Sequence, residues 1–188
     1  MPARATAWAV LAWVVAWVML RLSLSEALKW DYGEQMLWSQ QLALGYGSQP
    51  PLYTWLQWLA NQVFGPSVLA LSALKHALLA LSFALMYLAG RELLDERGAF
   101  WASASMLLLP PLGWASVRDQ THTILVTAMT CGAWWLLMRI ARQPRPRDFA
   151  LLGLVCGCGL LAKYSFALVA AAIATPRATK PPAVGRCN

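Results

Sequence analysis

The carboxyl groups of Asp31 and Glu34 open a polar stretch between apolar segments, which reads DYGEQMLWSQQLALGYGSQPPLYTW from position 31 to position 55. A carboxylate in a partly dry site can take a proton from an attacking hydroxyl group, which is general-base chemistry. The same two residues fit the start of a helix, with Asp31 as the N-cap and Glu34 in the first turn. The spacing alone leaves both interpretations open: a helix start that anchors a loop, or an active-site carboxylate.

The composition indicates a membrane protein. Of the 188 residues, 59% are hydrophobic and 12% are charged, which is too little charge to cover a soluble domain of this length. Eleven Trp and five Tyr suit the interfaces of a bilayer, where amphipathic rings lie at headgroup depth. The formal net charge of +7 comes from basic residues dispersed between apolar segments, so it indicates membrane topology, and we expect no nucleic-acid partner.

Apolar stretches of about 20 residues predict helices that cross the bilayer. The first stretch carries three Trp and lacks a small-residue cleavage site, which favours a span over a cleaved signal peptide. The last stretch has one charge, Lys163, near its middle. It is either a fifth span or, as we prefer, two short tilted helices that turn at Lys163-Tyr164. The expected fold class is an all-α, polytopic integral membrane helical bundle with spans at 4–21, 66–90, 99–117 and 123–141 and a hairpin at 149–175.

The basic connectors predict the orientation of this bundle. Arg4, the 91–97 connector and the 139–147 segment are rich in Arg, and the positive-inside rule places such segments in the cytoplasm. The N-terminus is then cytoplasmic. The loop of residues 25–65 lies outside, on the same side as the 118–122 segment.

That outer loop has the pattern of two amphipathic helices on the membrane surface. The first is expected from residue 31 to about residue 44, where the Gly-Tyr-Gly sequence at 45–47 ends it. Pro50-Pro51 prevents its continuation, and a second helix is expected at 52–64. The two helices would frame a pocket at the membrane surface.

A basic pair, Lys75-His76, interrupts the second apolar stretch. Such a pair inside a span tends to face a polar cavity or a lipid phosphate, and the alternative is that both side chains reach the outer interface. The cysteines form no Cys-x-x-Cys pair and lack paired His residues, so we expect buried apolar side chains and no metal site or disulfide. They are Cys131, Cys156, Cys158 and Cys187.

Residues 31–55 resemble the first extracytoplasmic loop of the GT-C membrane glycosyltransferases, in particular the dolichyl-phosphate-mannose protein mannosyltransferase-like and lipid A aminoarabinose transferase-like families. The residues that match at the family's spacing are Asp31, Trp38, Ser39, Leu42, Gly45, Tyr46, Pro50, Pro51 and Leu52. Tyr32 and Gly33 depart from the pattern, which has Glu and Ala there. The segment GLVCGCGLLAKY at 153–164 is similar to a family segment that closes a short span. The resemblance implies that residues 1–174 are the N-terminal part of a GT-C-like domain and that 175–188 are a linker-like or aberrant tail.

The resemblance also implies an activity: transfer of a sugar from a polyprenyl-phosphate donor to an extracytoplasmic acceptor, with inversion, in a bacterial inner membrane. Asp31 is then the general base. Lys163 is the first candidate and Arg118 the second for stabilising the leaving phosphate. Asp119 and His122 compete for one position in the second outer loop, where a divalent cation is possible although we expect no protein-bound metal. The candidate substrate-binding residues are Glu34, Tyr46, Lys75, Arg118, Asp119, His122, Lys163 and Tyr164.

Two functions without catalysis are alternatives. A small membrane protein could use the outer loop to bind lipid headgroups or to assemble with a partner. A transporter is less consistent with the sequence, because the spans lack two interrupted helices in corresponding positions of repeated halves. Loss of transfer in an Asp31→Asn variant that still inserts into the membrane would distinguish an enzyme from an anchor.

Overall fold

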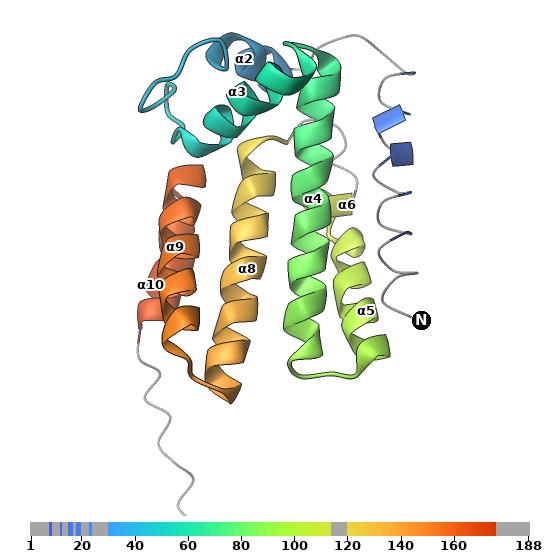
Figure 1. Cartoon of the computed structure of the whole chain (residues 1–188), viewed down its shortest axis with the longest axis vertical. Coiled ribbons are helices and arrows are strands. Elements are labelled where there is room, and N and C mark those ends of the chain that lie inside the picture. The colour runs from blue at the N-terminus through green and yellow to red at the C-terminus, as the bar shows by residue number, and fades with distance from the viewer. Residues whose placement is uncertain are drawn as a thin grey trace, which may run out of the picture.

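The computed structural model describes residues 30–113 and 120–175, together with residues 8, 12, 15, 16, 18, 19 and 23 (Figure 1). These residues form helices, loops and one isolated bridge, which confirms the predicted all-α class. The helices are α2 (Trp30–Trp38), α3 (Leu52–Phe64), α4 (Val68–Arg91), α5 (Glu96–Ala104), the 3-10 helix η1 (Ser105–Leu108), α6 (Pro110–Gly113), α8 (His122–Arg142), α9 (Pro146–Ala162) and α10 (Phe166–Ala174). The span expected at 4–21 lies almost wholly outside the described residues, as do Arg118, Asp119 and residues 176–188.

Within the described ranges, α4 and α8 are the two helices long and apolar enough to cross a membrane, at 24 and 21 residues. They correspond to the stretches predicted at 66–90 and 123–141. α4 begins where the hydroxyl of Ser67 accepts a hydrogen bond from the amide of Ala70, which is an N-cap. The two helices pack side by side in the middle of the bundle, and Leu79 and Leu125 lie in their common core (Figure 1).

The stretch predicted as a third span at 99–117 is not one continuous helix in its described part. α5 is 9 residues long, the turn η1 follows, and α6 starts a separate short helix. Pro110 and Pro111 explain the break, because proline lacks an amide donor and disfavours the helical conformation in the residue before it. α5 packs closely on α4, where a Cβ on Gly90 would lie 3.0 Å from Cα of Ala99.

The last apolar stretch forms the predicted helical hairpin, α9 and α10, and not a single long helix. α9 ends at Ala162, and the backbone of Lys163, its C-cap, is extended. Gly159 allows the two helices to meet, because the ring of Phe166 occupies the space that a side chain at position 159 would need. α10 then runs back along α9 (Figure 1).

α2 and α3 form a layer across one end of the bundle, over the ends of α8 and α9 and beside the end of α4 (Figure 1). α3 has the bounds that the sequence predicted. It follows Pro51 and stops at Gly65, whose φ of 71° lies in the left-handed region that favours glycine.

α2 differs from the prediction at both ends. It starts one residue before Asp31, so this carboxylate lies in the first turn and is not the N-cap. It also stops well short of Leu44, because the chain turns away and Tyr46 holds the turn. The Tyr46 hydroxyl accepts a hydrogen bond from the amide of Ala43 at 2.8 Å and donates one to the carbonyl of Gln41 at 2.5 Å.

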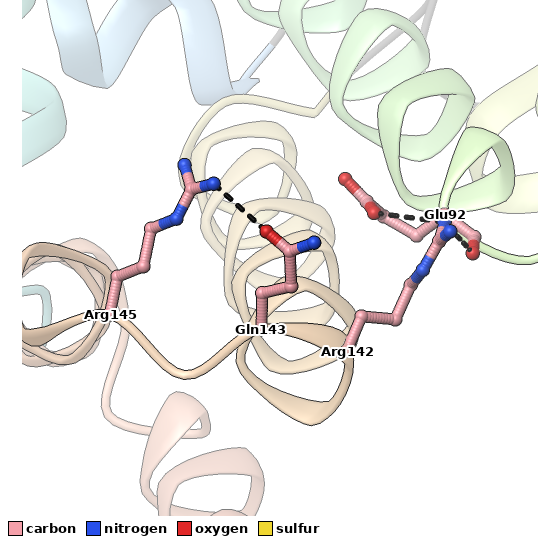
Figure 2. A network of polar contacts seen from close by, with 4 residues as sticks. All are labelled: Glu92, Arg142, Gln143 and Arg145. Atoms are coloured by element: carbon pink, nitrogen blue, oxygen red, sulfur yellow. Dashed lines mark hydrogen bonds and ion pairs between the residues drawn. The ribbon is translucent and has the colours of Figure 1, made fainter.

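The two basic connectors lie together at the end of the bundle opposite the α2–α3 layer (Figure 1). Arg142 donates to the backbone carbonyl of Glu92 at 2.5 Å and lies 3.4 Å from its carboxylate, which ties the two connectors to each other (Figure 2). Arg145 donates to the side chain of Gln143 at 2.9 Å. Their common location is what the positive-inside prediction requires of both connectors.

Candidate functional site

Asp31 lies half-buried in the first turn of α2, and the residue that follows it, Tyr32, is buried against a buried cation. Tyr32 is 1% exposed, and Nζ of Lys75 lies 4.7 Å from the centre of its ring, which is a cation–π contact. Lys75 and His76 are both fully buried, and Nδ1 of His76 lies 2.7 Å from the carbonyl of Ser72. The ammonium of Lys75 therefore faces the underside of α2 and not the open interface.

A chain of buried hydrogen bonds joins α2 to three other helices. Its centre is Gln35, whose Nε2 lies 3.0 Å from Nε2 of His122 and whose Oε1 accepts a bond from Thr54 at 3.2 Å. The other ring nitrogen of His122, Nδ1, lies 3.3 Å from the carbonyl of Ala162 at the end of α9. The ring of His122 also contacts the ring of Tyr53 in a tilted arrangement, with the ring centres 5.1 Å apart. His122 is thus part of the junction between the layer and the bundle.

Lys163 lies at the same junction, at the turn between α9 and α10. Its ammonium donates to the hydroxyl of Thr123 at 3.1 Å, and its side chain is half-buried. Tyr164, the next residue, is 67% exposed and points away from the packed interior. Of the two predicted residues, Lys163 and Tyr164, Lys163 is the one that contacts the polar residues at the junction.

α3 buries its polar side and exposes apolar residues, the reverse of a helix on a soluble protein. Thr54, Gln57 and Asn61 are buried, whereas Leu59 and Val63 are exposed. The amide of Asn61 accepts from Gln57 at 3.0 Å and donates to Ser39 at 2.9 Å, which fastens the end of α2 to α3. The sequence prediction did not identify these polar residues. The signal was present in the i, i+3, i+7 spacing of positions 54, 57 and 61 within an apolar helix.

Tyr46 and Glu34 have local partners. Tyr46 is 6% exposed, and its hydroxyl is engaged in closing the turn after α2. The carboxylate of Glu34 accepts a hydrogen bond from the indole of Trp30 at 3.1 Å, on the outer side of the helix. Tyr46 therefore holds the turn after α2, whereas the bond of Glu34 stays within α2.

The surroundings of Asp31 are electrostatically unusual. Burial raises the pKa of the Tyr53 hydroxyl far above its ordinary value, and the neighbouring Tyr32 and Asp31 raise it further. Tyr53 is therefore neutral at every physiological pH. A neutral, buried phenol within electrostatic reach of Asp31 fits a partly dry site.

A divalent cation finds little support in the described ranges. No group of three His, Cys, Asp or Glu side chains there could hold a metal ion. Both ring nitrogens of His122 already lie within hydrogen-bond distance of other groups, so a metal would have to displace Gln35 or the Ala162 carbonyl.

An open apolar groove of about 370 Å³ lies in the α2–α3 layer. It is formed by the turn after α2 and the exposed side of α3, and its lining consists of Leu42, Ala43, Leu44, Trp55, Trp58 and Leu59. The indole of Trp55 donates to the carbonyl of Ala43 at 2.8 Å, which holds the two sides of the groove together. The groove lies between this turn and α3, and no residue of α2 lines it, so it differs from the predicted pocket between two surface helices.

The structure therefore brings Asp31, Lys75, His122 and Lys163 to one end of the bundle. A carboxylate and two cations at one end of a bundle have, in chemical terms, the groups needed to take a proton and to stabilise an anion.

The sequence matches the family described as dolichyl-phosphate-mannose-protein mannosyltransferase over residues 48–178. This range includes Lys75, His122 and Lys163 and begins after Asp31. No solved structure matches the chain.

Several curated relatives share this region. Lipopolysaccharide core galacturonosyltransferase RgtB of Rhizobium johnstonii is 38% identical over 162 residues, which cover 86% of this chain and 33% of that protein. Lipid A galacturonosyltransferase RgtD of the same organism is 29% identical over 143 residues, or 74% of this chain and 29% of that protein. The undecaprenyl phosphate-alpha-4-amino-4-deoxy-L-arabinose arabinosyl transferase of Erwinia tasmaniensis is 28% identical over 137 residues, or 71% and 25%.

This chain thus spans about a third or less of the length of these relatives. The family match covers more than half of the chain, and the relatives are named as glycosyltransferases. The chain belongs to the dolichyl-phosphate-mannose-protein mannosyltransferase family, within the GT-C-like glycosyltransferases that residues 31–55 resemble.

Proposed function

We propose that this chain carries the outer-loop part of a membrane glycosyltransferase, which transfers a sugar from a polyprenyl-phosphate donor to an extracytoplasmic acceptor with inversion. The observation that carries the proposal is the position of Asp31. It lies half-buried on a short helix that buried polar contacts hold against α3, α4 and α8. Family membership supplies the reaction class, and this position supplies the candidate base.

In the proposed reaction, Asp31 takes the proton from the acceptor hydroxyl or amine. The acceptor atom forms a bond to the anomeric carbon from the face opposite the phosphate. The bond between that carbon and the phosphate oxygen breaks, and the polyprenyl phosphate leaves with the electron pair. Inversion follows from this single displacement.

The negative charge that develops on the leaving phosphate needs a cation. Lys163 is our first candidate, because an ammonium has three donors and can bind a phosphate oxygen while it keeps its bond to Thr123. Lys75 is a second cation at the same end of the bundle, buried under α2. A role for Arg118 in stabilising the leaving phosphate remains a prediction, and so does a role for Asp119.

We propose that the α2–α3 layer lies on the outer side of a bacterial inner membrane and that the two basic connectors and the N-terminus lie in the cytoplasm. The shared location of the connectors supports this orientation. The exposed apolar side of α3 supports contact between the layer and lipid. Residues 1–174 then form the N-terminal part of a GT-C-like domain, with 175–188 as a linker-like tail.

The donor sugar can be tested with a panel. Because RgtB transfers galacturonic acid according to its name and is 38% identical, polyprenyl-phosphate galacturonic acid is the first donor, followed by 4-amino-4-deoxy-L-arabinose and mannose. Membranes that contain the chain, or the longest reading frame that includes it, receive each radiolabelled donor together with lipid A or lipopolysaccharide core. Transfer from one donor supports the proposal, whereas no transfer from any donor with either form contradicts it.

The alternative function is lipid-headgroup binding without catalysis. The observation in its favour is the exposed apolar surface of the layer, with Leu44 at 90% and Leu42 at 57% exposure. This alternative predicts membrane association of the layer and no sugar transfer.

A further inference from the structure

α2 is too short to hold its own position. It has 9 residues, and isolated helices of this length are marginal even in favourable sequences. Contacts with the rest of the protein must therefore set both its place and its rotation. Gln35 follows Asp31 by one helical turn and so lies on nearly the same side of the helix.

In the series of hydrogen bonds around Gln35, the donor and the acceptor of each bond are fixed. The Ala162 carbonyl can only accept, so Nδ1 of His122 carries the proton and donates to it. A neutral imidazole then leaves Nε2 as an acceptor, which receives the amide N–H of Gln35. The amide oxygen of Gln35 is left to accept from the hydroxyl of Thr54. Each group in the chain is thus matched to the next.

The residues that form this series of hydrogen bonds are all buried. Gln35 is 1% exposed, Thr54 is fully buried and His122 is 6% exposed. A rotation of α2 would leave a buried donor and a buried acceptor without partners, which a protein interior penalises. The hydrogen bonds of Gln35 therefore define one rotation of the helix.

The series of hydrogen bonds ends at Ala162, the residue that precedes Lys163. The carbonyl of Ala162 accepts from His122, and the ammonium of Lys163 donates to Thr123, the residue after His122. One short junction between α8 and α9 thus holds the end of the chain and the candidate phosphate-binding cation.

We propose that Gln35 is a positioning residue for the transfer reaction: through Thr54 and His122 it sets the rotation of α2, and with it the position of Asp31 relative to Lys163. This inference rests on the proposed function of Asp31 as the general base. Gln35 does not touch the reacting atoms, so its effect passes through Asp31.

The test uses substitutions that remove hydrogen bonds and keep shape. Thr54→Val removes the donor to Gln35 and keeps the volume, and Thr54→Ser keeps the hydroxyl. Gln35→Leu removes both bonds of the amide, and Gln40→Leu makes the same change at an exposed position next to the end of α2. The variants are measured in whichever form, the chain or its longest reading frame, transfers sugar.

We expect Gln35→Leu and Thr54→Val to lower kcat by about 10- to 100-fold, with the KM for the donor unchanged, because the base is displaced while the donor site remains. Thr54→Ser and Gln40→Leu keep kcat within about twofold. Addition of Gln35→Leu to Asp31→Asn leaves the residual rate unchanged, because the base through which Gln35 acts is already absent. A further fall in the double variant, or an equal rise in KM, would indicate a merely structural role and overturn the proposal.

The two proposals fail in different ways. Full activity of Asp31→Asn removes the proposed function, whatever Gln35 does. An inactive Asp31→Asn with wild-type kcat in Gln35→Leu overturns the positioning role alone. A measurement without turnover adds a second criterion: the ¹⁵N NMR signal of His122 Nε2, assigned by its loss in His122→Asn, should move in Gln35→Leu and not in Gln40→Leu. An unmoved signal contradicts the bond between Gln35 and His122.

Discussion

The ring of Phe166 occupies the space beside Gly159, so the turn between α9 and α10 closes only because position 159 has no side chain. A Cβ there would lie 2.5 Å from Cε1 of Phe166. The turn also carries Lys163, the candidate cation of the site. A glycine in α9 thus determines where that cation lies.

Gly159→Ala should destabilise the protein by about 1–3 kcal/mol, because the methyl group forces the ring or the helix to move. Melting in detergent checks this expectation. Gly157→Ala is the matched control on the same helix, since no atom lies within 4 Å of its Cβ position. Partial rescue of Gly159→Ala by Phe166→Leu would confirm the contact, and equal stability of the two alanine variants would contradict it.

The second prediction concerns the ion pair at the end of the bundle opposite the α2–α3 layer. Arg139 and Asp148 lie 3.1 Å apart, with the Asp148 side chain 4% exposed. Asp148→Asn should cost about 1–3 kcal/mol of stability, because the arginine loses its charged partner in a poorly hydrated place. Glu92→Gln, which affects the more exposed pair with Arg142, should cost at most about 1 kcal/mol. A larger loss of stability in Glu92→Gln than in Asp148→Asn would contradict the burial of the Asp148 carboxylate.

Several elements were predictable from the sequence because local residues determine them. α3 has its predicted bounds because Pro51 precedes it and Gly65 follows it. The hairpin was predictable from one charge, Lys163, in the middle of an apolar stretch. The third span was predicted incorrectly as a continuous helix, because its hydropathy was given more weight than the break at Pro110 and Pro111.

The candidate site was predictable only in part. Asp31 and Lys163 stood out as charges next to apolar segments. The chain from Thr54 through Gln35 to His122 did not, because Gln35 and His122 are 87 positions apart and meet only after α2 folds across the ends of the bundle. Uncharged amide side chains do not stand out in a hydropathy pattern. The one local signal was the spacing of Thr54, Gln57 and Asn61 on one side of α3.

A third prediction follows from the raised pKa of Tyr53. The folded state keeps the Tyr53 proton at a pH where the unfolded chain, with an ordinary tyrosine pKa near 10, has lost it. The contribution to stability is therefore complete below pH ~10 and decreases as the pH rises above it. When the pH is raised from 8 to 11, the melting temperature should fall less in Tyr53→Phe than in the wild type. Tyr164→Phe, at an exposed tyrosine, should behave as the wild type, and the same pH dependence in all three proteins would refute the prediction.

The orientation gives a fourth prediction. In a chain whose four native cysteines are replaced by serine, Ser48→Cys places a thiol in the exposed turn between α2 and α3, and Gln143→Cys places one in the basic connector. A membrane-impermeant maleimide should label the first in intact spheroplasts and the second only after the membrane is opened. Labelling of the Gln143→Cys thiol in intact spheroplasts would reverse the proposed orientation.

The most direct test of the account is sugar transfer by the wild type compared with Asp31→Asn. The amide keeps the shape of the carboxylate and cannot take a proton, so kcat should fall by about 100-fold or more while expression, insertion and donor binding remain. Glu92→Gln, which removes a carboxylate at the opposite end of the bundle, is the control and should keep most of the activity. An Asp31→Asn protein that transfers sugar at the wild-type rate would contradict the assignment of Asp31 as the base.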